Sequence, residues 1–249
     1  MLCLKTERTK KAKAPVCIAC GEATTNGRYV TGVGYICNQC YGQKSYDFSD
    51  FSEKGKPGKL ASFGFEVEVD PCLSKHYTLL KHGFVPTYDG SVEMEFKSPI
   101  YYSKSGLQIV LDTMSIFASD IVSTHIHFEC VDKDLAISNW KPIWIPIANY
   151  LYEREDLTRK IFGRFFSSRW CSKYVTIDER YTAFNIATKY DTWELRLPRF
   201  RSPDQFSKLI DWGRRVSQRL TLTDPDKARM GIIRDFNKIF GTEVPIDLH

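Results

Sequence analysis

The chain has 249 residues, of which 43% are hydrophobic, 14% aromatic and 26% charged. This composition is typical of a folded globular protein and excludes a disordered or fibrous one. The longest uncharged apolar stretch is residues 143–152, whereas a membrane helix needs about 20 residues. The N-terminus lacks the apolar segment of a secretory signal, and no Asn-x-Ser/Thr acceptor occurs. We therefore expect a cytoplasmic protein with no membrane partner.

The net charge of +5 is concentrated at the N-terminus. Residues 1–14 contain five basic side chains and one acidic side chain, so this tail carries +4 and the remaining chain is nearly neutral. A short basic tail is either a solvated end or an arm that binds nucleic acid by displacing counterions from phosphates. The sequence leaves both interpretations of the tail open.

The next segment, residues 15–43, has the cysteine spacing of a zinc ribbon. Two Cys-x-x-Cys pairs supply four thiolates, those of Cys17, Cys20, Cys37 and Cys40. Zinc binds four such thiolates as a tetrahedron, and a hairpin between the pairs brings them together. Asn26-Gly27 is a turn dipeptide, and residues 28–31 and 35–36 favour strands. Two disulfides are the alternative, but they require an oxidising compartment.

The ribbon is followed by residues 44–60, whose serines, glycines and lysines are typical of a linker. We therefore expect a domain boundary here. A zinc ribbon of this size binds nucleic acid, binds protein or merely caps a neighbouring domain. The sequence does not separate these roles.

From residue 61 onward the chain alternates predicted strands and helices. In Phe63–Asp70 the odd positions are apolar, so the period of two places Glu66, Glu68 and Asp70 together on the opposite face. The pattern recurs in residues 92–97, 121–131 and 193–197, with residues 180–187 as a partner strand for the last. The polar positions of the later strands include Glu93, Glu95, Lys97, Ser123, His125, His127, Glu129, Glu194 and Arg196.

Helical patterns lie between and after these strands. The predicted helices are residues 74–82, 104–118, 139–155, 157–169, 203–220 and 225–240. The last two begin with Ser202-Pro203 and Asp224-Pro225, each an N-cap residue followed by proline, and the final helix ends before Gly241. Apolar stripes on these helices need a surface to cover. The sequence thus predicts an α+β fold, in which a largely antiparallel sheet carries helices on one face and an open acidic active-site face on the other.

The polar face has an unusual composition. One strand of this kind is ordinarily a half-exposed strand with its charges in water, but four strands here contribute mainly glutamate, histidine and arginine. Clustered carboxylates repel unless cations lie between them, so the pattern favours a site for divalent metal ions. Arg196 and Arg180 then suit an anionic ligand such as phosphate. Sequence motifs of P-loop proteins, of α/β-hydrolases and of helix-borne zinc proteases are absent.

An ordered set of short motifs resembles the amidoligases, which are carboxylate–amine ligases related to glutamine synthetase and glutamate–cysteine ligase. The motifs are Gly64-Phe65-Glu66-Val67-Glu68, Asp89-Gly90-Ser91, Glu95-Phe96-Lys97-Ser98-Pro99, His125-Ile126-His127, Arg180 with Asn185, and Thr192-Trp193-Glu194-Leu195-Arg196. The resemblance covers residues 64–196 and identifies residues 61–249 as an amidoligase-like catalytic domain. It departs from the family in two places: only three residues separate Ser91 from Glu95, and Ser123-Thr124 precedes the histidine pair.

The resemblance implies an ATP-dependent enzyme that joins a carboxylate to an amine through an acyl phosphate. Glu66, Glu68, Glu95 and Glu194 are then expected to bind magnesium ions that bridge the ATP phosphates, with His127 and Asn185 also on the nucleotide side. Arg196, Arg180 and His125 are expected to act on the transferring phosphoryl group. Asp89 and Ser91 are expected to shape the substrate end of the cleft. The sequence leaves open whether the substrate is a protein, a peptide or a small metabolite.

Two other functions remain open from the sequence. The same polar face could bind zinc or manganese directly through His125, His127 and the glutamates, as in a metal-dependent hydrolase or nuclease. Alternatively, the basic tail and the zinc ribbon bind nucleic acid or protein, and the larger domain is a scaffold without catalysis.

Overall fold

The computed structural model describes residues 13–17, 22–30, 34–37, 53–54, 60–87, 92–167, 171–177, 179, 181–186 and 191–248. Most of the predicted basic tail and most of the predicted linker lie outside these ranges. In the ribbon segment, β1 (Gly27–Val30) and β2 (Gly34–Cys37) form an antiparallel hairpin in which Tyr29 pairs with Tyr35. The predicted hairpin between the strand-forming residues 28–31 and 35–36 is therefore present, and Asn26-Gly27 lies at the start of β1 instead of at the turn between the strands.

The larger domain is built on an eight-stranded sheet. Its strands run in the order β3 (Glu53–Lys54), β7 (Ile100–Tyr101), β4 (Phe63–Val69), β8 (Ile121–Glu129), β10 (Thr192–Leu195) and β9 (Phe184–Ile186), while β6 (Met94–Lys97) pairs with both β4 and β5 (Val85–Thr87). All of these pairings are antiparallel except that of β3 with β7. Two residues of the predicted linker thus belong to the sheet, as its edge strand β3.

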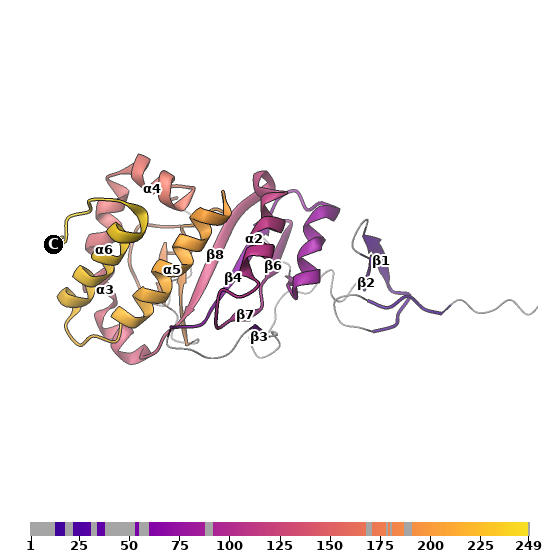
Figure 1. Cartoon of the computed structure of the whole chain (residues 1–249), viewed down its shortest axis with the longest axis horizontal. Coiled ribbons are helices and arrows are strands. Elements are labelled where there is room, and N and C mark those ends of the chain that lie inside the picture. The colour runs from indigo at the N-terminus through magenta and orange to yellow at the C-terminus, as the bar shows by residue number, and fades with distance from the viewer. Residues whose placement is uncertain are drawn as a thin grey trace, which may run out of the picture.

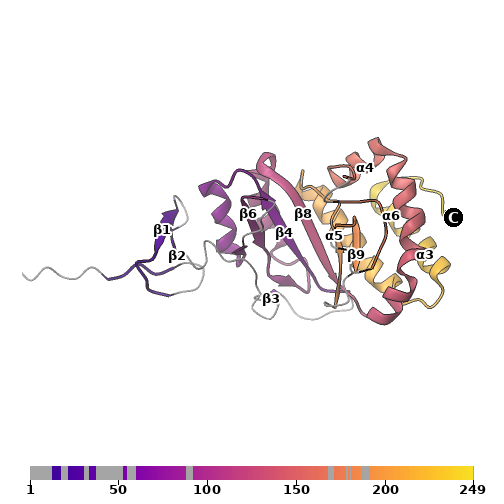
Figure 2. The same ribbon diagram turned by 180° about the vertical axis from the view of Figure 1, so that it is seen from behind.

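Helices cover one face of this sheet, as Figures 1 and 2 show from opposite sides. They are the 3₁₀ helices η2 (Ser74–His82) and η3 (Ala118–Asp120) and the α-helices α2 (Leu107–Ser115), α3 (Lys133–Tyr152), α4 (Glu155–Phe162), α5 (Pro203–Arg219) and α6 (Pro225–Phe240). The predicted α+β class with a largely antiparallel sheet is confirmed. None of the helices in the described part of the chain has the length and apolar character that a membrane crossing needs.

Aromatic side chains fill the layer between the sheet and the helices. Phe128 stacks on Trp193 with ring centroids 4.7 Å apart, and the Trp193 indole donates a hydrogen bond of 2.8 Å to Ser217 on α5. Trp144 of α3 stacks on Phe184 of β9 at 4.2 Å. Each of these ring systems is fully buried, so the layer gains about 2 kcal/mol or more per large side chain. This packing buries the apolar face of the sheet against the helices, and the polar side chains lie on the opposite face.

Helix boundaries differ from the sequence prediction at several places, and α2 is three residues shorter at each end than the predicted residues 104–118. Helix α3 begins at Lys133, where Asp132 accepts a hydrogen bond from the Leu135 backbone, and it continues through Pro142 and Pro146. Helix α4 ends at Phe162 because Gly163 adopts a left-handed backbone with φ of 82°, and a β-carbon there would collide with the Arg199 carbonyl oxygen. The predicted continuation of this helix to residue 169 is therefore wrong.

Candidate functional site

Strand register places the polar side chains of β4, β6, β8, β9 and β10 in rows across one face. Glu66 pairs with His125 on β8 and with Lys97 on β6. Glu194 pairs with His127 on one side and with Asn185 on the other. The polar cluster formed in this way consists of Glu66, Glu68, Glu95, Lys97, His125, His127, Asn185, Glu194 and Arg196.

His125 lies at the centre of the polar cluster. Its Nδ1 atom is 3.2 Å from Oε2 of Glu66 and 3.5 Å from Oε1 of Glu194. Its Nε2 atom is 2.9 Å from Oγ of Ser123 and 3.6 Å from Oε1 of Glu68. The imidazole of His125 therefore contacts carboxylates of β4 and of β10 at the same time.

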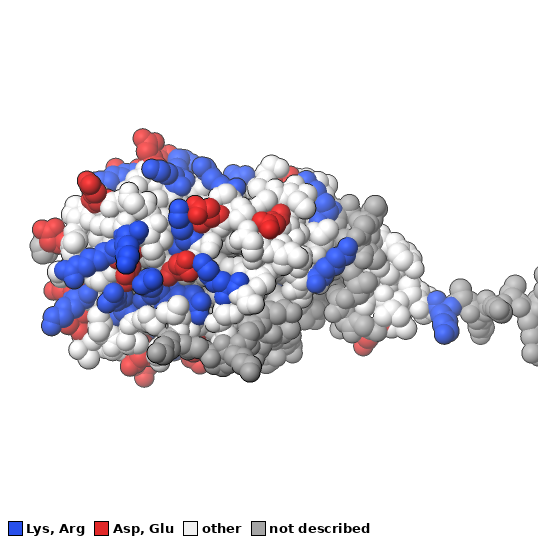
Figure 3. Space-filling view, in the orientation of Figure 1, with Lys and Arg blue, Asp and Glu red and all other residues white. Residues whose placement is uncertain are grey.

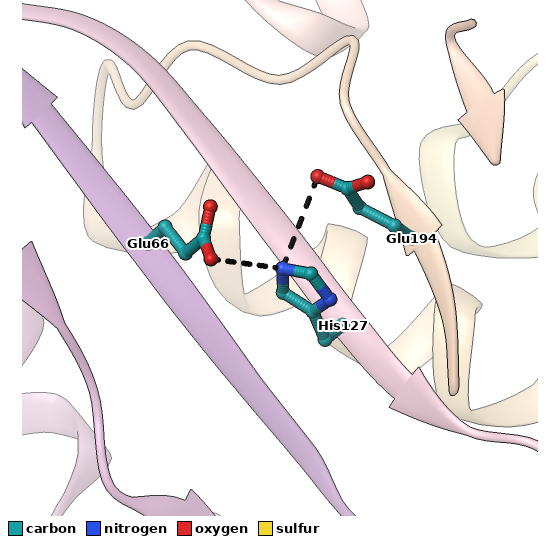
Figure 4. A group of neighbouring side chains, drawn as sticks. All are labelled: Glu66, His127 and Glu194. Carbon is teal, nitrogen blue, oxygen red and sulfur yellow. Dashed lines mark ion pairs between the residues drawn. The ribbon is translucent and has the colours of Figure 1, made fainter. Parts of the chain in front are cut away.

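His127 occupies a similar position one pleat away. Figure 4 shows Glu66, His127 and Glu194 projecting toward one another from β4, β8 and β10. The Nε2 atom of His127 lies 3.4 Å from Oε1 of Glu66 and 3.8 Å from Oε1 of Glu194. Three neighbouring strands thus aim their ligating atoms at one point.

Two cations lie among these carboxylates. Nζ of Lys97 is 3.0 Å from Oε1 of Glu66 and 3.5 Å from Oε2 of Glu95. Nη1 of Arg196 donates a hydrogen bond of 2.8 Å to Glu194, whose other oxygen accepts from Asn185 at 2.9 Å. Lys97 was not predicted as a site residue, although its alternation with Glu95 on one strand places both on the polar face.

The polar cluster is more enclosed than the sequence predicted. Glu66, Glu95, Glu194 and Arg196 are each less than 9% exposed, so the expected open acidic face is wrong for these side chains. The ring of Tyr181 lies 5.9 Å from the Arg196 guanidinium, and the Arg196 backbone N–H donates to the Ala183 carbonyl, which continues the pairing of β9 with β10. Strand alternation determines which face is polar, but it does not reveal how closely the side chains on that face pack against one another.

Burial and neighbouring charge affect the carboxylates differently. Burial alone raises the pKa of Glu66, but His127, the hydrogen bond from His125 and Lys97 together hold it well below its usual range. Burial and the charge of Glu66 raise the pKa of Glu95 well above its usual range. Burial opposes ionisation of Glu194 too, yet Arg196 and the two histidines lower its pKa. The polar cluster therefore combines ionised carboxylates with one that holds its proton more tightly.

The donor atoms of the polar cluster fit divalent metal ions. Two sets, Glu66 with His127 and Glu194, and Glu66 with Glu95 and His125, each have ligand atoms within 4.8 Å of one another. Ligands of one ion, each bound at about 2.0–2.6 Å, are separated by no more than about 5 Å. Carboxylates suit magnesium and manganese, whereas imidazole suits zinc. Both sets include Glu66, which can thus bridge two ions.

Several predicted residues fall elsewhere. Asp70 is exposed beyond the end of β4. The pairing register of β4 with β8 shifts between Glu68 and Val69, so Asp70 does not lie in line with Glu66 and Glu68 on the polar face. Asp89, Ser91 and Arg180 lie outside the described residues. The predicted substrate end and one predicted phosphate ligand are therefore not placed.

Two of the four predicted zinc ligands are described. Cys17 and Cys37 are buried, and the backbone N–H of Cys37 donates to the Cys17 sulfur at 3.3 Å. Hydrogen bonds from backbone N–H groups to ligating sulfur atoms are typical outer contacts of a metal centre. Cys20 and Cys40 lie outside the described residues.

A pocket of about 270 Å³ adjoins the polar cluster. It begins at Glu66, Lys97 and His127 and extends over Gly64 to Glu129 and Asp191. Neither Gly64 nor Asp191 was identified from the sequence as part of a substrate site, because neither carries a distinctive reactive group. A small molecule thus has a route to the buried carboxylates.

Comparison with family models, with curated proteins and with solved structures found no match to this chain. The functional argument therefore depends on the side chains described above.

Proposed function

We propose that the polar cluster is the active site of an ATP- and magnesium-dependent carboxylate–amine ligase. The observation that carries the proposal is the convergence of Glu66, His127 and Glu194 from three neighbouring strands, with ligating atoms within 4.8 Å of one another. Arg196 beside Glu194 supplies a cation that anionic phosphate groups require. The motif series that resembles the amidoligases supports the same function, and it supports an acyl phosphate as the activated carboxylate.

The residues divide into two tasks in this proposal. Glu66, Glu68, Glu95 and Glu194 would hold magnesium, which neutralises phosphate charge and orients ATP when bound. Arg196 binds the phosphoryl group in transfer, and Asn185 holds Glu194 in place through its hydrogen bond of 2.9 Å. His125 keeps Glu66 and Glu194 at a fixed separation by contacting both. Arg180, Asp89 and Ser91 keep their expected roles near phosphate and substrate.

Calorimetry with magnesium and a non-hydrolysable ATP analogue tests this proposal on the full chain. We expect magnesium-dependent nucleotide binding that falls at least tenfold in Glu194→Gln and in Arg196→Met. Glu155→Gln is the matched control, because Glu155 is exposed on α4 and contacts Arg159 instead of the polar cluster. Nucleotide binding that is absent at millimolar ligand, or equal in all variants, contradicts the ligase.

The four cysteines Cys17, Cys20, Cys37 and Cys40 are proposed to bind one structural zinc ion. The contact between Cys37 and the Cys17 sulfur, on the hairpin of β1 and β2, supports this proposal. Metal analysis of purified protein should find one tightly bound zinc per chain, lost in Cys17→Ser but not in Cys130→Ser, whose cysteine is buried in the larger domain. Equal zinc content in both variants contradicts the ribbon.

A metal-dependent hydrolase or nuclease is the second candidate. It is favoured by the presence of an imidazole in both donor sets, because mixed histidine and carboxylate sites suit zinc and manganese. A hydrolase should keep a second zinc or manganese ion after dialysis and should cleave a phosphodiester without ATP. A ligase should do neither.

Nucleic-acid binding without catalysis has one supporting observation in the larger domain. Figure 3 shows Lys and Arg gathered over the side of the molecule where α5 and α6 lie. Arg215 and Arg219 of α5 have side chains 50% and 42% exposed, although Asp235 lies 3.0 Å from Arg219. Nucleic-acid binding through basic side chains weakens steeply with salt. If the basic side chains of α5 and α6 bind nucleic acid together with the basic tail, Arg215→Gln should reduce the affinity.

A further inference from the structure

The pocket beside the polar cluster has a permanent cation at its inner end. Of the described residues that line this pocket, Lys97 is the only one with a fixed positive charge. Its Nζ atom lies 3.0 Å from Oε1 of Glu66 and 3.5 Å from Oε2 of Glu95, and its side chain is 22% exposed. That oxygen of Glu95 also accepts a hydrogen bond of 2.7 Å from Thr87. The charge of Lys97 is therefore balanced chiefly by Glu66.

Lys97 and a divalent ion compete for this carboxylate. Glu66 belongs to both sets of potential metal ligands, and Glu95 belongs to one of them. When Glu66 binds a metal ion, Lys97 loses its closest partner and lies beside a second positive charge. A partly buried cation without a counter-charge is unfavourable, so this end of the pocket then favours an anion. An ammonium group is repelled there by both the metal ion and Lys97.

The rest of the pocket restricts which anion fits. Gly64 and Ile100 line its middle, where the absent side chain of Gly64 leaves room for an apolar group. The outer end holds the exposed carboxylates of Glu129 and Asp191. Lys133 lies 3.3 Å from Asp191, so two negative charges face one positive charge at this end. The outer end therefore repels a second anionic group and accepts a neutral or cationic one.

We propose that this pocket binds the carboxylate substrate, that this substrate is an aliphatic carboxylate without a second anion at its far end, and that Lys97 holds its carboxylate group once a metal ion has bound Glu66. The inference rests on the proposed ligase function and names the carboxylate that the ligase activates. Arg196 and Glu194, which are assigned to the phosphate groups of ATP, do not line this pocket. Glu66 does line it, so the pocket meets the nucleotide side at this residue.

The contact with Lys97 keeps the substrate carboxylate next to Glu66, a ligand of the metal ion that binds ATP in the proposed function. A carboxylate oxygen forms a bond to the γ-phosphorus as the bond from that phosphorus to the bridging oxygen breaks, and ADP leaves with the electron pair. The amine nitrogen then forms a bond to the acyl carbon, and phosphate leaves with the electrons of the C–O bond and with a proton of the amine. Lys97 binds the carboxylate and transfers no proton.

Calorimetry of the full chain tests the chemistry of the ligand. The pocket follows residues 62–66 over about 13 Å, which leaves room for a six-carbon chain. Hexanoate, 6-aminohexanoate, adipate and acetate are therefore titrated into the protein, in metal-free buffer and with magnesium. We expect magnesium to tighten hexanoate binding at least tenfold. Acetate, which lacks the apolar chain, and adipate, whose far end is a second carboxylate, should each bind at least fivefold more weakly than hexanoate, and 6-aminohexanoate should bind at least as tightly.

Three outcomes of these titrations overturn the proposal. They are hexanoate affinity that does not change with magnesium, adipate that binds as tightly as hexanoate, and no hexanoate binding at tens of millimolar with magnesium present. Binding and metal affinity are also linked reciprocally, so hexanoate should tighten manganese binding by the factor by which manganese tightens hexanoate binding.

Substitution of Lys97 separates its role from direct binding of the carboxylate to the metal ion. Lys97→Met should weaken hexanoate binding at least tenfold with magnesium present, yet it should tighten manganese binding because a competitor for Glu66 is gone. A lysine that only stabilises the fold would not move the two affinities in opposite directions. Lys97→Arg keeps the charge and should bind hexanoate within threefold of the unsubstituted protein. Lys97→Gln replaces Lys97→Met if that variant does not fold. Magnesium-dependent hexanoate binding that survives loss of the lysine charge overturns the role of Lys97.

Substitution at Gly64 tests the location. Gly64→Val should weaken hexanoate binding at least tenfold and leave manganese affinity within threefold, because valine fills the middle of the pocket. A β-carbon at this position would meet Oγ of Ser98 at 3.5 Å and the Pro99 carbonyl oxygen at 3.6 Å, which are ordinary contacts. Gly64→Ala is therefore tolerated, and it replaces Gly64→Val, with a smaller expected loss, if that variant does not fold. Unchanged hexanoate binding in the variant that folds overturns this location.

The two proposals fail in different ways. Magnesium-dependent nucleotide binding without magnesium-dependent hexanoate binding overturns the carboxylate pocket and supports the ligase. Magnesium-dependent hexanoate binding that Lys97→Met removes, in a protein that binds no nucleotide, supports the pocket and overturns the ligase. The Glu155→Gln control should behave as the unsubstituted protein in both titrations.

Discussion

Glu66 and His125 lie directly opposite each other on the central strands β4 and β8, with Nδ1 of His125 3.2 Å from Oε2 of Glu66. This pairing joins the two longest strands of the sheet on the face that the helices do not cover. Phe65 and Ile126, their neighbours in sequence, pair across the same strands and are buried on the helical face. The period of two thus places chemistry and core on opposite sides of one strand pair.

Glu95→Gln should stabilise the protein in the absence of metal. Burial and the charge of Glu66 raise the pKa of Glu95, so its ionised form is unfavourable in the folded state. Glutamine has the same shape without the charge, and we expect the unfolding free energy to rise by about 1 kcal/mol and the melting temperature by a few degrees. Thermal unfolding in chelator measures this change.

The same variant should lose stabilisation by divalent ions. Adding magnesium or manganese should raise the melting temperature of the unsubstituted protein more than that of Glu95→Gln, because a ligand that binds only the folded state stabilises it in proportion to its affinity. Glu155→Gln again serves as the control. A lower melting temperature of Glu95→Gln in chelator would show that Glu95 contributes to the fold instead of opposing it.

Glu194 and Arg196 should show strong energetic coupling. Both are buried, and the 2.8 Å contact between them is the shortest ion pair of Glu194. Removing one partner of a buried pair leaves the other charge without compensation, so Glu194→Leu and Arg196→Met should each cost about 3 kcal/mol in unfolding free energy. The double variant should cost less than the sum of the two. Chemical denaturation of the four proteins measures the coupling, and strict additivity contradicts it.

Gly213→Ala should weaken the packing behind the site. The β-carbon would overlap the Phe128 ring, so α5 cannot stay in place against β8. We expect a loss of roughly 2 kcal/mol or more, partly restored in combination with Phe128→Leu, which vacates the space. Gly241→Ala is a contrasting variant, since its β-carbon would meet nothing within 4 Å and its cost comes from a φ of 64°. Restoration by Phe128→Leu should therefore be specific to Gly213→Ala.

Much of this fold could be predicted from local sequence signals. Alternation located β4, β6, β8 and β10, and an N-cap followed by proline, together with a final glycine, gave the bounds of α6. The start of α3 was predicted at residue 139, whereas the helix begins at Lys133 after the N-cap Asp132; Pro142 and Pro146 lie inside both the predicted and the observed helix. Local signals could not describe contacts between distant strands.

The role of Lys97 shows the same limit within the site. Its position on the polar face followed from alternation, but a lysine on a strand is ordinarily solvated. Only the register of β6 against β4 brings its ammonium group to 3.0 Å from Glu66. The burial of the polar cluster likewise depends on contacts between side chains of different strands. Residue types were predictable, whereas their partners were not.

Lys97→Met should increase the affinity of the polar cluster for a divalent ion. The Lys97 ammonium group lies 3.0 Å from Glu66 and 3.5 Å from Glu95, so it competes with a metal for the same oxygens. A unit charge about 4 Å away contributes a few kcal/mol at an effective dielectric constant of about 20, and we expect manganese to bind at least roughly tenfold more tightly. Titration followed by electron paramagnetic resonance counts the bound ions and gives their affinity.

Lys104→Met is the control, because Lys104 is paired with Asp211 of α5. If manganese binds neither the unsubstituted protein nor Lys97→Met, while Lys97→Met merely unfolds more easily, the lysine serves to balance structural carboxylates and the polar cluster is not a metal site.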